Sequence, residues 1–166
     1  MMTNLYKESE SPIKREVSDK SSWHESGYDC LEENTQVLMA NGSLKEIKCI
    51  SMGELVHSAN GCVCQVRNIL TQKVSDCYKI TYEDRNAVTA TVDHPFLTDN
   101  GWKRVNELKV GDMLLDEGGN PVCIERIEKA DGVLKVISLV FDSPTILIAN
   151  GVQSGDFYAL NGKMPE

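Results

Sequence analysis

The stretch "NGWKRVNELKVGDML" (100–114) decides the fold because it repeats an earlier one, "NGSLKEIKCISMGELV" (41–56). Both begin with Asn-Gly, continue with a basic and an aliphatic residue, and reach a glycine, an acid and two apolar residues. The earlier segment is one residue longer than the later one. An internal duplication is the simplest account, and it predicts two similar β subunits related by a pseudo-twofold axis. The alternative is that hairpins with polar turns look alike by chance.

Short apolar and β-branched runs alternate with turn signals along most of the chain. Asn-Gly occurs at 41–42, 60–61, 100–101, 150–151 and 161–162, and this dipeptide supplies the positive φ angles of tight hairpins. Strands are predicted for "CYKITY" (77–82), "AVTATV" (87–92), "VLKVISLVF" (133–141) and "TILIA" (145–149). The segments 45–56 and 103–114 offer only a brief helical turn. The pattern therefore predicts an all-β fold.

The composition bounds the class of protein. A chain of 166 residues fits one domain with a tail, and a net charge of −8 argues against a nucleic-acid partner. No apolar run approaches the length of a membrane span, so no membrane partner is expected. Residues 1–29 are charged and Ser-rich with few aliphatic side chains. Such a segment buries too little apolar surface to offset its ordering entropy, so it is predicted to be a flexible flank.

Three blocks of this sequence resemble those of Hint domains, the group that includes inteins, Hedgehog autoprocessing domains and bacterial intein-like domains. They are "CLEENTQVLMANGSLKEI" (30–47), "VTATVDHPFLTDNGWKRVNELKVGDML" (88–114) and "VISLVFDSPTILIANGVQSGD" (136–156). The resemblance implies a horseshoe-like all-β fold made of two duplicated subunits. It also implies three parts: an extein-like flank at 1–29, an autoprocessing domain at 30–156, and a C-terminal strand or flank at 157–166.

The resemblance implies self-cleavage. The family's opening cysteine falls on Cys30, whose thiol would attack the carbonyl of the Asp29–Cys30 bond and convert the amide into a thioester. The family's Thr-x-x-His falls on Thr91 and His94. His94 would protonate the departing nitrogen, Thr91 would orient that peptide group, and Asp93 would support the histidine by tuning its charge. A threonine and a histidine three residues apart share a face only where the strand bends.

The closing block departs from the intein pattern. Inteins usually end in His-Asn followed by Cys, Ser or Thr, and the aligned positions here hold Gly155, Asp156 and Phe157. Full splicing is therefore expected to fail, although Asp156 could still close slowly on the backbone. The N-terminal step remains, with the flanking polypeptide in cis as substrate and water or an external amine or thiol as acyl acceptor. The Asp29 carboxylate could speed release through a cyclic anhydride. The pattern is most similar to bacterial intein-like domains without the His-Asn ending.

Two other interpretations of the sequence remain open. The first is a degenerate Hint-like scaffold inside a larger bacterial protein, which the altered ending favours. The second is a thiol–metal binder built on Cys62 and Cys64, although the sequence has no second close pair to complete a zinc site. No metal or cofactor is needed for the predicted reaction. The expected location is the cytoplasm, or outside the cell as part of an exported host protein.

Overall fold

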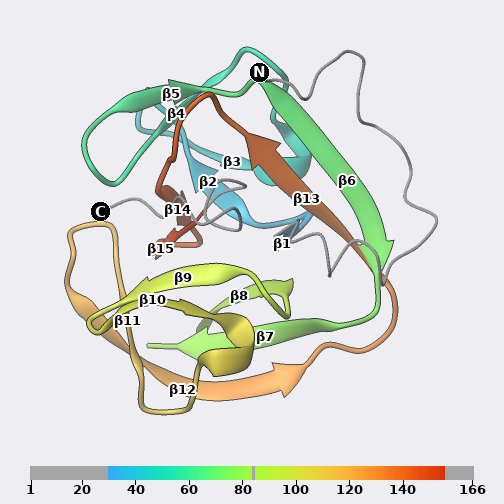
Figure 1. The fold of residues 1–166 in the computed structure, drawn as a ribbon, viewed down its shortest axis with the longest axis vertical. Coiled ribbons are helices and arrows are strands. Elements are labelled where there is room, and N and C mark those ends of the chain that lie inside the picture. Colours follow the sequence, from blue (N-terminus) through green and yellow to red (C-terminus); the bar gives the residue numbers. More distant parts are fainter. Residues whose placement is uncertain (1–29, 84, 156–166) are drawn as a thin grey trace.

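The computed structural model describes residues 30–83 and 85–155, and the regular elements of this part of the chain are almost all strands (Figure 1). The all-β prediction is therefore confirmed. In chain order the elements are β1 (Leu31–Glu32), β2 (Gln36–Leu38), β3 (Leu44–Glu46), the 3₁₀ turn η1 (Ile47–Cys49), β4 (Leu55–His57), β5 (Val63–Gln65), β6 (Asn68–Val74), β7 (Cys77–Tyr82), β8 (Asn86–Thr91), β9 (Pro95–Thr98), β10 (Gly101–Arg104), the 3₁₀ turn η2 (Val105–Glu107), β11 (Met113–Leu115), β12 (Pro121–Lys129), β13 (Leu134–Val140), β14 (Leu147–Ala149) and β15 (Val152–Ser154). None of the described helices is long and apolar enough to cross a bilayer.

One antiparallel sheet system holds nearly all of these strands, in the order β3-β2-β14-β15-β9-β11-β12-β7-β8-β1-β13-β6, with β10 beside β9 and β4–β5 as a separate pair. Strand β1 lies between β8 and β13, so that Leu31 is opposite both Ala90 and Ile137. The start of the domain is thus held in the interior of a sheet rather than at an edge (Figure 1).

The predicted duplication is present in the structure. The segment β3–η1–β4 and the segment β10–η2–β11 repeat the same backbone course. Their hydrogen bonds and ion pairs match at a constant spacing of 58 residues. The hydrogen bond from Gly53 N–H to the Val66 carbonyl matches the one from Gly111 N–H to the Ile124 carbonyl. The bond from Ile50 N–H to the Ile47 carbonyl likewise matches the one from Leu108 N–H to the Val105 carbonyl. The ion pair Lys45–Glu54 matches the ion pair Lys103–Asp112.

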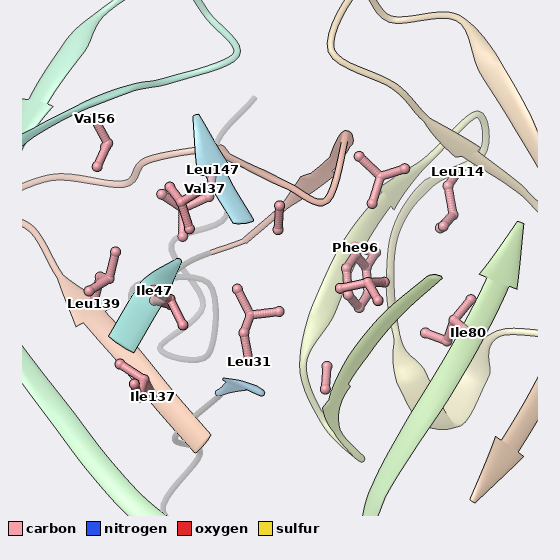
Figure 2. Packing of buried hydrophobic residues seen from close by; sticks show 14 of the residues in the cluster. Leu31, Val37, Ile47, Val56, Ile80, Phe96, Leu114, Ile137, Leu139 and Leu147 are labelled. Atoms are coloured by element: carbon pink, nitrogen blue, oxygen red, sulfur yellow. The ribbon is translucent and has the colours of Figure 1, made fainter. Parts of the chain in front are cut away.

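The two repeats share one main hydrophobic core. Figure 2 shows Leu139 and Ile47 on one side, Phe96 and Leu114 on the other, and Leu31 between the two groups. Side chains of consecutive strand residues point to opposite faces. Leu31 therefore joins the main core, whereas its neighbour in the chain belongs to a second, smaller apolar cluster. We call this the Cys30 cluster; its members Cys30, Val74, Cys77 and Val136 are all at most 1% exposed.

A tight turn fastens the end of the domain to its beginning. Asn150 and Gly151 both have positive φ angles, 48° and 88°, as a two-residue hairpin between β14 and β15 requires. The Asn150 side chain accepts a hydrogen bond from the Gln36 amide at 2.7 Å and donates one to the Ala87 carbonyl at 2.8 Å. These contacts fix β15 beside β9, where Ser154 is opposite Phe96.

Candidate active site

Cys30 and Thr91 are held together by three contacts although 61 residues separate them. The Cys30 amide N–H donates to Thr91 Oγ1 at 3.1 Å, and the Thr91 amide N–H donates to the Cys30 carbonyl at 3.1 Å. The Thr91 hydroxyl donates to that same carbonyl at 3.4 Å. Both residues are fully buried. The sheet order produces this pairing, because β8 ends beside the start of β1.

The chain bends directly after Thr91, as the Thr-x-x-His spacing predicts. Strand β8 ends at Thr91, a turn occupies the next two positions, and β9 begins at Pro95. The His94 amide N–H closes this turn on the Thr91 carbonyl at 3.1 Å. Pro95 therefore starts a new strand rather than interrupting one.

His94 is buried against neighbours that fix its ring. Its Nε2 lies 2.5 Å from the Ser154 hydroxyl, and its ring centroid lies 4.9 Å from that of Phe96. Burial, aided by the positive charge of Arg104, lowers the pKa of His94 to about 3. The imidazole is consequently neutral at pH 7.

Of the three other acids assigned to the site, the structure describes only Asp93. Asp93 sits in the turn between Thr91 and His94, and its main-chain carbonyl accepts a hydrogen bond from the Arg104 guanidinium at 3.1 Å. Asp29 and Asp156 lie outside the described residues. The supporting role of these three acids stays a prediction.

Two buried polar residues join the site without having been singled out from the sequence. Ser154 is fully buried, contacts His94, and donates to the Gly155 carbonyl at 3.2 Å. Gln72, on β6, is 8% exposed and places its Nε2 atom 4.0 Å from Cys30 Sγ. Both come from strands far away in the sequence, so no local motif marks them.

Cys77 shares the Cys30 cluster but has a different chemical character. Burial, together with the charges of Asp76 and Glu32, raises the pKa of the Cys77 thiol to about 12. It therefore stays protonated near neutral pH and behaves as a small hydrophobe. Within residues 30–83 and 85–155, no group of three or more histidine, cysteine or acidic side chains is arranged to hold a metal ion.

Comparison with known proteins places the chain in a class. The family model for the pretoxin Hint domain matches residues 37–155. The gp41-1 intein crystal structure superposes with a TM-score of 0.64 at 30% identity, covering 76% of this chain and 97% of that one. A bacterial intein-like domain from Clostridium thermocellum superposes with a TM-score of 0.66 at 27% identity, covering 76% of this chain and 98% of that one. A DnaB intein from Synechocystis superposes with a TM-score of 0.67 at 20% identity, covering 77% of this chain and 98% of that one. At this identity the match shows a likeness of fold alone.

Two curated proteins match parts of the chain. The replicative DNA helicase DnaB of Rhodothermus marinus is 32% identical over 106 residues, which is 57% of this chain and 10% of the helicase. The DNA-directed RNA polymerase subunit Rpo1N of Methanocaldococcus jannaschii is 55% identical over 38 residues, 23% of this chain and 3% of the subunit. The chain thus spans a tenth or less of the length of these relatives.

The duplicated all-β fold, the family-model match and the likeness to intein structures define a Hint domain, the self-processing class to which inteins belong. The chain belongs to the pretoxin Hint domain family.

Proposed function

We propose that the domain carries out an N-to-S acyl shift at the Asp29–Cys30 bond and then releases the polypeptide upstream of Cys30, without completing protein splicing. The observation that carries this proposal is the hydrogen bond from the Cys30 amide N–H to Thr91 Oγ1, 3.1 Å long and fully buried. That nitrogen is the leaving group of the proposed reaction. It is held by a side chain of the family's Thr-x-x-His motif.

The proposed reaction is balanced within the chain itself. The Cys30 sulfur bonds to the Asp29 carbonyl carbon, the carbon–nitrogen bond breaks, and the thiol proton ends on the Cys30 nitrogen. The products are a thioester and a free α-amine. Attack within one chain avoids the entropy of bringing two molecules together. Water then hydrolyses the thioester, or an external amine or thiol takes the acyl group.

Thr91 is suited to orient the leaving nitrogen. A hydroxyl has one proton to donate and can accept on its lone pairs. In this site the proton points to the Cys30 carbonyl, at 3.4 Å, which leaves a lone pair to accept from the Cys30 N–H. As the nitrogen becomes tetrahedral, this contact holds its hydrogen in place and leaves the developing lone pair open to a proton.

We assign to His94 the transfer of that proton. A neutral imidazole can accept the thiol proton as sulfur attacks and then pass it to the nitrogen, whereas a ring already protonated could not act as the base. Burial keeps His94 neutral at pH 7 by lowering its pKa to about 3. The Ser154 hydroxyl, 2.5 Å from Nε2, fixes the ring orientation and the position of its proton.

The end of the domain supports cleavage without splicing. Gly155 occupies the position of the assisting histidine of inteins and has no side chain, and its amide N–H is used by the Pro95 carbonyl at 2.9 Å. Asp156 and Phe157 replace the asparagine and nucleophile that C-terminal cleavage needs. The substrate is accordingly the flanking polypeptide in cis, and the Asp29 carboxylate favours release of the acyl group over its storage.

The experiment is to purify the chain and a Cys30→Ala variant, incubate both with and without dithiothreitol, and compare their masses. The proposal expects wild type to lose residues 1–29 and the variant to stay intact. A degenerate scaffold is the second candidate, favoured by the altered ending, and it expects both proteins to stay intact. An Asp29→Ala variant that releases its flank as fast as wild type removes the anhydride route.

A further inference from the structure

Gln72 is a buried polar side chain in an apolar setting. It lies on β6 opposite Val136 of β13, and Val136 is in turn opposite Glu32 of β1. Paired residues of neighbouring strands point to the same face, so this register brings Gln72 to the face that carries the Cys30 cluster. Only 8% of Gln72 is exposed, and Val74 and Val136 beside it are at most 1% exposed.

The two ends of the Gln72 amide differ in their contacts. Nε2 donates toward Cys30 Sγ at 4.0 Å. Oε1 is buried and has no hydrogen-bond partner among residues 30–83 and 85–155. Leaving a buried amide oxygen unpaired costs about 1–3 kcal/mol, so folding stability alone does not explain a glutamine here. An apolar side chain of the same length would fit this cluster better.

We propose that Gln72 is a catalytic residue of the acyl shift, donating its Nε2 hydrogen to the Cys30 sulfur as negative charge develops there. This inference rests on the proposed function and adds a residue to it. When the thiol proton leaves, sulfur must carry charge inside an apolar cluster, which disfavours the charged form. A donor aimed at the sulfur offsets that penalty without adding a charge to the core, since a hydrogen bond to an ionised group is stronger than one between neutral groups.

The test compares Gln72→Met with a matched control, Gln153→Met, in purified full-length chain. Methionine keeps the length of glutamine but has no N–H donor. Gln153 is similarly buried, 7% exposed, and its Nε2 donates to the Asp116 carbonyl at 3.0 Å rather than to the cysteine. The measurements are the rate of dithiothreitol-induced loss of residues 1–29 across pH, and the thermal midpoint Tm of the uncleaved chain.

The two variants should separate function from stability. Gln72→Met should cut the cleavage rate at pH 7 about tenfold and move the acid limb of the pH profile up by roughly one unit, since a tenfold change corresponds to one pKa unit. Its Tm should stay level or rise because the unpaired oxygen is gone. Gln153→Met should lower Tm and leave the cleavage rate and its pH profile as in wild type.

The pH shift can be assigned to the sulfur because the substitution leaves every titratable neighbour in place. Cys77 shares the cluster with Cys30, and the charged groups that act on Cys77 are Asp76, Glu32 and Lys129.

A Gln72→Met chain that cleaves with the wild-type rate and pH profile overturns the inference. A wild type that does not cleave points instead to failure of the proposed function. If Gln72→Met does not fold, Gln72→Glu decides: a carboxylate beside the sulfur repels its charge, so the acid limb should move up further, and an unmoved limb overturns the inference.

Discussion

Replacing Thr91 with valine removes one hydroxyl from a fully buried position and changes little else. The substitution leaves the Cys30 N–H without its acceptor at 3.1 Å, in a place that is 0% exposed. An orphaned buried donor costs about 1–3 kcal/mol. We expect Thr91→Val to lower the free energy of unfolding by that amount, a fall in Tm of about 2–4 °C for each kcal/mol in a chain of this size.

The same change should slow cleavage about tenfold to a hundredfold, because each 1.4 kcal/mol of lost transition-state stabilisation is roughly a factor of ten in rate. The assay follows loss of residues 1–29 by intact mass. Thr91→Ser keeps the hydroxyl and should retain most of the rate. Thr89→Val, the same swap two residues earlier on β8, is the matched control and should cleave like wild type.

A Thr91→Val chain that is destabilised yet cleaves at the wild-type rate would show that the hydroxyl only supports the fold. The reasoning given for the leaving nitrogen would then be wrong. Equal slowing of Thr91→Val and Thr89→Val would contradict it too, because it would trace the effect to the strand and not to this hydrogen bond.

Three further predictions concern the surroundings of Cys30. The pKa of His94 is about 3 in the folded chain and near 6.5 in the unfolded chain. Its contribution to the free energy of unfolding is therefore complete above pH 6.5 and is lost as the pH falls toward 3, by at most about 1.4 kcal/mol per pH unit. Denaturant titrations across pH should show a flatter stability profile for His94→Gln than for wild type. Ser154→Ala should slow cleavage about tenfold because the His94 ring loses its contact with the Ser154 hydroxyl. The effect on proton transfer is measured from the pH profile of the cleavage rate. An unchanged pH profile would contradict a role of Ser154 in positioning the ring. Cys77→Ala should leave the cleavage rate within about twofold of wild type, because a thiol with a pKa near 12 takes no part; abolished cleavage in a folded variant would refute this.

Much of the strand pattern could be predicted because its signals are local. The predicted strand 77–82 matches β7 residue for residue, and 87–92 differs from β8 by one position at each end. The Asn-Gly turns at Gly42, Gly61, Gly101 and Gly151 all have positive φ. These features depend on a few neighbouring residues, so the sequence carries them plainly.

The contacts of the candidate site could be predicted only where a sequence motif includes the residues that make them. Cys30, Thr91 and His94 belong to recognisable blocks, and the structure brings Thr91 into contact with Cys30. Gln72 and Ser154 were not predicted because their contacts with Cys30 and His94 depend on strand order: β6 lies two strands from β1, and β15 lies beside β9. Buried polar residues in otherwise apolar strands were the one available signal, but such residues often serve only the fold.

The central claim is that the thiol at position 30 takes over the acyl group of Asp29, and the most direct measurement traps that group. Intact chain is incubated with free cysteine, and both products are weighed by mass spectrometry. We predict residues 1–29 extended by one cysteine, together with a chain that begins at Cys30, and neither product from Cys30→Ala. A chain that remains whole, or one cut at another bond, would contradict the account.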